Sequence, residues 1–311
     1  MIGGTLGCTA ALLAVAVLAL CFGERPWRSR AIYGCCLALS LVSFGIAITQ
    51  YQAEPVRIVL PLGLPWIGAN FRLDALSAAF LVVTNFGAAA ASLYALGYGE
   101  HELTPMRVLP FFPAFLAGMN LVVLADDAFT FLVAWEFMSL TSWALVMAHH
   151  EHPENLRAGY VYLVMASFGA LCLLLAFALL AGADGSYAFG SIEAGRHSRG
   201  LTGLVLVLVL LGCGSKAGLA PLHVWLPLAH PAAPSHVSAV MSGVMTKVAI
   251  YGFIRIVFDL LGDPEWWWAM VVLALGGGTA VLGVLYAVME KDLKKLLAYS
   301  TIENIGIIFV G

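Results

Sequence analysis

Residues 212–255 read GCGSKAGLAPLHVWLPLAHPAAPSHVSAVMSGVMTKVAIYGFIR, and this stretch decides how the rest of the chain is organised. It predicts two apolar helices joined by a turn that is rich in proline and histidine. Lys216 lies well inside the first helix and Lys247 well inside the second. Because a lysine at the centre of a bilayer costs about 2.5–3.5 kcal/mol, two such lysines require a reason.

The residues around Lys216 predict an interruption of the first helix. Proline removes a backbone donor and clashes with the preceding helical turn. A helix broken beside a buried ionisable residue indicates an ion path. The alternative is a kinked packing helix whose lysine snorkels to the surface, but Lys216 lies more than a dozen residues from either end of its apolar run. The interrupting residues are Gly212, Gly214, Gly218 and Pro221.

The composition is that of a multi-pass protein of the lipid bilayer. Of 311 residues, 61% are hydrophobic and 11% charged, and the mean hydropathy is +0.94. Soluble domains average about 25% charged residues. The net charge is -3 without any basic or acidic block, which argues against a nucleic-acid partner. The six cysteines have no C-x-x-C spacing, so they are interpreted as small core residues and not as metal or disulfide ligands.

Ten apolar runs are long enough to cross a ~30 Å hydrocarbon core. They fall near 4–23, 31–52, 73–98, 107–125, 127–149, 157–181, 201–230, 235–260, 267–289 and 293–311. Between them, residues 53–72 predict a short strand or hairpin and residues 182–200 a loop. With the N-terminus outside, eight connector Lys and Arg fall on the inner side and four on the outer side, so the positive-inside rule predicts an external N-terminus.

Glu136 is the acidic counterpart of the two lysines. It lies about nine residues into the fifth predicted helix, or ~14 Å along it, at a depth similar to Lys216 and Lys247. A Glu136–Lys216 pair keeps both groups charged, and separating the pair favours the neutral form of each, so that Lys216 releases a proton. An arginine would not release one. The alternative is a static, structural ion pair.

Four further ionisable residues complete the candidate set. Glu303 lies near mid-depth in the last predicted helix, and three histidines line the turn between the two lysine helices. The histidines are either relay groups or interfacial polar residues, and His223, inside the broken helix, has the stronger case as a relay. The candidates for proton transfer are therefore Glu136, Lys216, Lys247, Glu303, His223, His230 and His236. No nucleotide loop, haem pair or cysteine cluster predicts a bound cofactor or metal.

Four motifs in order carry a family resemblance. They are WEFMSLTSW with Glu136, SKAGLAPLHVWLP with Lys216, MTKVAIYG with Lys247 and DLKKLLAYST at 292–301. Across about residues 70–311 the chain resembles the proton-conducting, antiporter-like subunits shared by respiratory complex I, membrane-bound hydrogenases and multi-subunit sodium/proton antiporters. STIENIG, with Glu303, is similar to the large membrane subunit of hydrogenase-4 and formate hydrogenlyase complexes.

The resemblance implies an all-α polytopic fold of about ten membrane helices. Residues 1–106 would hold three helices, 107–260 one complete five-helix repeat (helices 4–8) with a broken seventh helix, and 261–311 the start of a second, incomplete repeat. Members of the family usually have about fourteen helices, so we expect a C-terminally truncated chain. The exit half-channel that the family builds in its second repeat would then be missing.

The resemblance also implies a function. We expect a non-catalytic subunit of an oxidoreductase complex of the NADH-quinone or hydrogenase type, which moves protons, or sodium, across a bacterial inner membrane. Its partners would be other integral membrane subunits and a peripheral iron–sulfur hydrogenase or dehydrogenase arm. One alternative is a cation/proton antiporter subunit without redox partners. Another is a passive membrane anchor, against which three mid-depth ionisable residues count.

Overall fold

The computed structural model describes residues 2–21, 27–64, 68–99, 105–182, 185, 187–194 and 197–311. The first half comprises α1 (Ile2–Cys21), α2 (Arg28–Gln50), β1 (Val56–Leu64), β2 (Gly68–Leu73), α3 (Ala75–Tyr98), α4 (Pro105–Val108), α5 (Phe111–Leu124), α6 (Ala128–Val146) and η2 (Met147–His149). The second half comprises α7 (Pro153–Ala181), α8 (Phe189–Ala194), α9 (Arg199–Ala217), η3 (Leu222–Trp225), α10 (Leu226–Ala232), α11 (Ser235–Val240), η4 (Met241–Met245), α12 (Thr246–Ile254), η5 (Arg255–Leu260), α13 (Trp266–Met289) and α14 (Leu293–Val310).

The predicted polytopic helical fold is confirmed. Within the described residues, nine helical segments are long and apolar enough to cross a membrane. The tenth predicted segment, near 293–311, does form a helix, α14, but it is not among these nine, since Lys294, Lys295 and Glu303 place three charged residues within its 18 residues. The division into one complete and one partial five-helix repeat stays a prediction.

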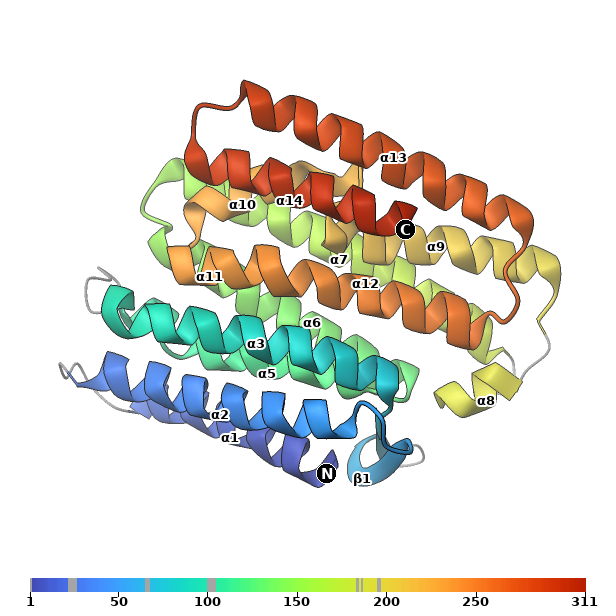
Figure 1. Ribbon diagram of the computed structural model, residues 1–311, viewed down its shortest axis with the longest axis horizontal. Coiled ribbons are helices and arrows are strands. Elements are labelled where there is room, and N and C mark those ends of the chain that lie inside the picture. The colour runs from blue at the N-terminus through green and yellow to red at the C-terminus, as the bar shows by residue number, and fades with distance from the viewer. Residues whose placement is uncertain are drawn as a thin grey trace.

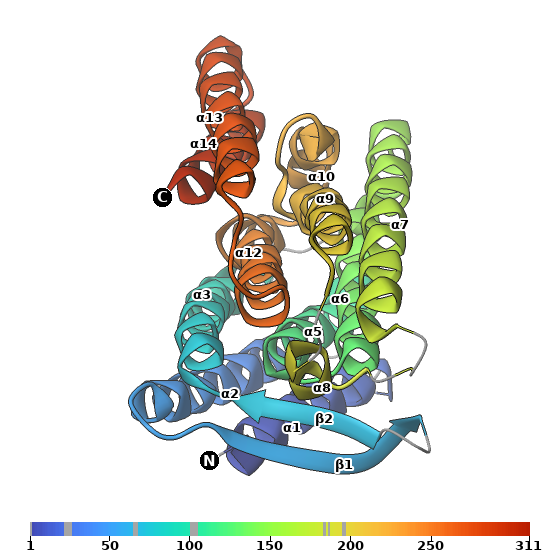
Figure 2. The same ribbon diagram turned by 90° about the vertical axis from the view of Figure 1, so that its right-hand side faces the viewer.

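The long helices lie side by side, with their axes roughly aligned (Figure 1). Viewed along those axes, α1 and α2 lie at one edge of the bundle and α13 and α14 at the opposite edge (Figure 2). Between these edges α5, α6, α7, α9 and α12 enclose the apolar core, which includes Phe131, Trp135 and Tyr162. The β-hairpin and α8 lie at the same end of the bundle, which we call the hairpin side.

The hairpin predicted within residues 53–72 is confirmed. Strands β1 and β2 pair antiparallel, with Arg57 opposite Arg72. The second edge of β2 is attached to the connector between α5 and α6, since Asp127 accepts a 2.8 Å hydrogen bond from the backbone N–H of Asn70. Asp127 also accepts from the backbone N–H of Thr130 at 2.7 Å and so caps α6.

The loop predicted at 182–200 is only partly right. Its described residues include a short helix, α8, which is bonded to the α5–α6 connector through Phe189 N–H and the carbonyl of Asp126 at 3.0 Å. Glycine and serine content alone predicted the loop; tertiary contact with the connector is what orders the backbone there.

The break beside Lys216 is confirmed. Helix α9 ends at Ala217, and Gly218 then adopts a left-handed conformation with φ of 89°, which a residue with a side chain avoids. The chain continues through the one-turn η3 into α10. The backbone groups freed by the break find partners: Trp225 donates to the Ser215 carbonyl at 2.7 Å, and Ala220 N–H donates to the Thr279 hydroxyl at 3.0 Å.

The second lysine helix contains two π-helical segments, η4 and η5, on either side of α12. Such wide turns leave carbonyls open to side chains. The Ser242 carbonyl accepts from the Lys247 ammonium at 2.9 Å and from the Thr246 hydroxyl at 2.8 Å. The π-helical turn in η4 therefore anchors the side chain of Lys247 toward the side of the membrane opposite the hairpin.

Candidate functional site

Lys216 lies at the broken end of α9 and is only 4% exposed. Its ammonium donates a 2.9 Å hydrogen bond to the hydroxyl of Ser139 and a 2.7 Å hydrogen bond to the hydroxyl of Tyr162. It lies 4.8 Å from the centre of the Tyr162 ring, on the hydroxyl side of that ring. Two hydroxyls thus replace part of the hydration of this ammonium.

Glu136 belongs to the same centre but not by direct contact. Ser139, which binds Lys216, follows Glu136 by three residues and so shares its face of α6. The charges of Glu136 and Lys216 act on one another, yet the two groups form none of the ion pairs within 4.0 Å found among the described residues. The direct pair expected from the sequence is thus replaced by hydroxyl contacts, and the buried Oε1 of Glu136 has no hydrogen-bond partner.

Sequence reasoning missed the hydroxyls of this centre. Tyr162 on α7 and Ser142 on α6 share a 2.5 Å hydrogen bond, which extends the network beyond Lys216. A signal was present, because Ser139 and Ser142 recur at helical spacing after Glu136 in WEFMSLTSW. Tyr162, in contrast, carried no local pattern; only the packing of α7 against α6 and α9 brings it to the lysine.

Lys247 lies in a second polar centre. It lines a cavity of about 610 Å³ between α10, η4 and α14, together with His230, Ser242, Lys294 and Thr301. Ser242 and Thr301 share a 2.5 Å hydrogen bond across this cavity. The lining is partly polar, so the cavity is suited to hold water beside the lysine.

His230 lies at the side of this cavity away from the hairpin. One ring nitrogen contacts the Ser238 hydroxyl at 2.9 Å, and the buried Nε2 has no partner. Lys294, on α14, donates to the carbonyl of Ala233 at 3.0 Å and so closes the C-terminal end of α10. His230 is thus the predicted histidine that the structure brings closest to the Lys247 centre.

The two centres are not joined by hydrogen bonds within the described part of the chain. The Tyr162 hydroxyl reaches the sulfur of Met245 at 3.8 Å, and Met245 lies two residues before Lys247 in the chain. Glu136, Lys216 and Lys247, which the sequence places at similar depth, therefore lie in two polar centres with a methionine between them. Passage of a proton between the two centres requires water or a movement of Met245.

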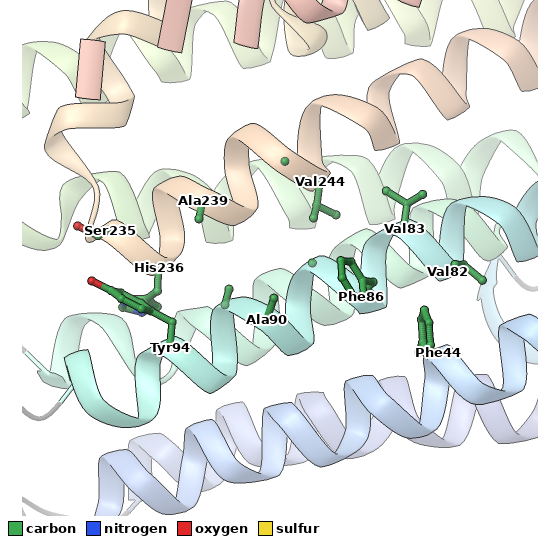
Figure 3. A pocket seen from close by; sticks show the side chains of 13 residues that line it. Phe44, Val82, Val83, Phe86, Ala90, Tyr94, Ser235, His236, Ala239 and Val244 are labelled. Carbon is green, nitrogen blue, oxygen red and sulfur yellow. The ribbon is translucent and has the colours of Figure 1, made fainter. Parts of the chain in front are cut away.

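Three predicted residues lie apart from both centres. His223 is half-buried in η3, with an unpartnered Nδ1. His236 contacts the Tyr33 hydroxyl at 3.1 Å and lies beside Tyr94 at one end of an apolar groove of about 810 Å³ between α2, α3 and η4 (Figure 3). Glu303 packs its backbone against Gly283 of α13 and does not line the Lys247 cavity.

The groups described above do not suggest a metal site. Within the described ranges, no cluster of three or more His, Cys, Asp or Glu side chains has a metal-binding arrangement. The chemistry that the arrangement offers is proton exchange among a lysine, hydroxyls and a carboxylate in one centre, and between a lysine and a histidine in the other.

A multi-pass helical membrane subunit with a lysine at a helix break and a carboxylate nearby is the class that this fold and site define. Residues 125–311 match the family described as "NADH:quinone oxidoreductase/Mrp antiporter, TM". The chain belongs to this family.

Individual relatives agree with this assignment. The chain is 44% identical to hydrogenase-4 component B of Escherichia coli over 246 residues, which are 78% of this chain and 36% of that protein. It is 32% identical to a protein of a probable K(+)/H(+) antiporter of Rhizobium meliloti, covering 88% of this chain and 28% of that protein. The chain thus spans well under half the length of these relatives.

A solved structure shows the same fold. A chain of the membrane-bound sulfane sulfur reductase, an archaeal respiratory membrane complex, superposes on 97% of this chain and 50% of its own length. The TM-score is 0.84 and the sequence identity 26%.

Proposed function

We propose that this chain translocates protons as a membrane subunit of an oxidoreductase complex of the hydrogenase-4 or complex I kind. The observation that carries the proposal is Lys216: a buried ammonium at a helix break, held by two hydroxyls and influenced by Glu136. A packing lysine would reach for the membrane surface. The ammonium of Lys216 instead stays buried among neutral groups, so that Lys216 can release its proton.

The geometry supports a two-position cycle. With Glu136 near, its negative charge favours the charged form of Lys216. When Glu136 moves away, the ammonium retains only neutral acceptors in a buried site, so the neutral amine becomes favoured. The proton then leaves Lys216 for Lys247 through water near Met245, and the Lys216 amine is neutral until the next proton arrives.

The Lys247 cavity supports exchange with the side opposite the hairpin. His230 and Lys294 lie beside it, and its polar lining suits a chain of water. Neutral His230 can accept and pass on a proton through its two ring nitrogens. We propose that Glu136, Lys216, Lys247 and His230 carry the transfer, while His223, His236 and Glu303 have supporting roles.

The partners are proposed from the relatives. Hydrogenase-4 component B and a respiratory membrane complex are among the similar proteins. These likenesses support further integral membrane subunits as partners. We further propose a peripheral iron–sulfur or dehydrogenase arm that performs the redox chemistry, and a bacterial inner membrane with the N-terminus outside, as the charges of the connectors predict.

Replacing Lys247 by methionine in the intact complex tests the function. Redox-driven acidification of inverted vesicles is expected to fall at least tenfold, while the complex assembles normally, because methionine occupies similar volume without exchanging protons. Lys291, which is exposed, provides the matched control: Lys291→Met is expected to retain transport. Full acidification with Lys247→Met would refute a relay through Lys247.

A second candidate function is cation/proton antiport without a redox partner. The likeness to a protein of a K(+)/H(+) antiporter supports it. The same vesicles separate the two functions, because antiport needs potassium or sodium on one side and proceeds without an electron donor. Proton movement that follows an imposed cation gradient, and not electron supply, would favour antiport.

A further inference from the structure

A third polar cluster lies on the hairpin side of Lys247 and is not used by the proposed transfer. It contains equal numbers of arginine and aspartate residues, and we call it the arginine–aspartate cluster. Its members are Arg57, Arg72, Arg255, Asp74, Asp126 and Asp259. They come from the hairpin, the start of α3, the α5–α6 connector and η5, so the cluster forms only in the folded chain.

Arg255 is the centre of the cluster and is only 2% exposed. Its guanidinium pairs with both oxygens of Asp74, at 2.8 Å each. It further donates to Ser77 Oγ at 2.9 Å and to the Tyr251 hydroxyl at 3.0 Å. One nitrogen also pairs with Asp259 at 2.5 Å. A guanidinium has five N–H donors, and the five contacts occupy all of them.

Arg72 forms a second layer toward the surface. Its Nε lies 3.1 Å from Asp126 and 3.2 Å from Asp74. Arg57, directly opposite Arg72 in the hairpin, contacts the other oxygen of Asp126 at 3.2 Å. Like charges at opposed positions of a hairpin repel, and here Asp126 lies between them. The three arginines and three aspartates leave the cluster without net charge.

The cluster continues a polar row that begins at Lys247. Tyr251, Arg255 and Asp259 follow Lys247 at intervals of four residues along α12 and η5, which places them along one side of the helix. Arg255 is eight residues from Lys247, or about 12 Å at 1.5 Å per residue. Asp259, at the far end, is 34% exposed. The row therefore runs from the Lys247 cavity to the surface on the hairpin side.

Apart from Arg255, this row consists of groups that can exchange protons. The Tyr251 hydroxyl contacts Ser77, and the carboxylates of Asp74 and Asp259 lie beyond it. Hydroxyls and carboxylates bridged by water make a proton path. An arginine at such a position does the opposite, because it cannot release a proton in a protein and because, while they are paired with it, Asp74 and Asp259 are not free to take one up.

We infer that Arg255, supported by Arg72, is an electrostatic barrier that prevents a proton on Lys247 from escaping to the hairpin side. The inference rests on the proposed proton function, because a barrier matters only where Lys247 carries protons. It assigns direction to the site: the Lys247 cavity exchanges with the side opposite the hairpin, while the hairpin side is closed. A purely structural ion cluster would have no effect on proton leak through Lys247.

Passive proton leak in the absence of electron donor tests the barrier. The intact complex is reconstituted in liposomes with a pH-sensitive dye inside, and a potassium diffusion potential with valinomycin drives protons. Arg255→Gln is expected to raise the leak at least tenfold over wild type. Arg255→Lys, which keeps the charge but has a group that can release its proton, is expected to leak more than wild type and less than Arg255→Gln. Arg199→Gln, at a 93% exposed position outside the cluster, is the matched control and is expected to behave as wild type.

The path of the leak is tested by adding Lys247→Met to Arg255→Gln, which is expected to return the leak to the wild-type level. Because Arg255→Gln leaves Asp74 unpaired, the paired variant Arg255→Gln/Asp74→Asn is made alongside; it removes both charges and is expected to leak equally. No increase in leak in these variants, or an increase that Lys247→Met does not suppress, would overturn the barrier. Redox-driven transport that survives Lys247→Met contradicts the proposed function instead, so the two failures are distinguishable.

Discussion

The ammonium of Lys216 donates a 2.7 Å hydrogen bond to the hydroxyl of Tyr162 while lying 4.8 Å from the centre of the same ring. The hydroxyl accepts the hydrogen bond, and the ammonium lies beyond the edge of the ring on the hydroxyl side. Removing the hydroxyl alone therefore removes the direct contact while the ring stays in place.

Tyr162→Phe is expected to slow redox-driven proton transport by roughly tenfold. A hydrogen bond to a charged group contributes about 1.5–3 kcal/mol, and about 1.4 kcal/mol corresponds to a factor of ten. The ring remains, so packing against Trp225 is retained. Acidification of inverted vesicles measures the rate. Tyr160→Phe, at a 70% exposed position on the same helix, is the control; equal rates in the two variants would contradict a role for the hydroxyl.

Lys216→Arg is expected to assemble but to transport at less than about a tenth of the wild-type rate. The positive charge is conserved, so Glu136 keeps its electrostatic partner. The guanidinium, however, does not release its proton at neutral pH. Proton pumping and electron transfer are measured in the same vesicles, with Lys291→Arg as the control at an exposed lysine. Pumping at the wild-type rate would show that charge alone suffices at this position.

Gly218→Ala is expected to destabilise the chain. The φ of 89° at the end of α9 is left-handed, and an L-residue there costs about 1–2 kcal/mol. An added Cβ would also collide with the side chain of Leu226. The melting temperature in detergent measures the effect. Gly277→Ala is the matched control, because its added Cβ meets no atom within 4 Å in α13 and is expected to be neutral or stabilising.

Asp74→Asn is expected to lower the melting temperature at pH 7 and to have a smaller effect in acid. Burial by itself raises the pKa of Asp74, but the contacts with Arg255 outweigh burial and lower the pKa from 3.8 to about 2. A carboxyl with a lowered folded-state pKa stabilises the fold above its unfolded pKa, and this contribution is lost as pH falls from 3.8 toward 2.

The same melting experiment includes a control for Asp74→Asn. Asp263→Asn alters an exposed aspartate and is expected to shift the melting temperature little at any pH. If the difference between wild type and Asp74→Asn stayed constant from pH 7 to pH 2, the charge of Asp74 would not be the stabilising feature.

The sequence by itself determined the helices and the break. Long apolar runs leave few alternatives to membrane helices, because the backbone must satisfy its hydrogen bonds internally in lipid. Gly218 and Pro221 are local signals, since glycine permits the left-handed turn and proline withholds a donor. The depth of Glu136, Lys216 and Lys247 followed from counting residues along each helix. These features depend on short-range chemistry, that is, on residues close to one another in the sequence.

Only the tertiary structure decided which groups meet. Tyr162 reaches Lys216 from α7, and Arg255 meets Asp74 across 181 positions of the chain. Neither pairing has a sequence pattern, because a membrane helix presents a different neighbour on each side and its rotation is set by packing. The two histidines differ for the same reason. His230 lies at the Lys247 cavity, whereas His236, six residues later, contacts Tyr33 on the other side of the second lysine helix.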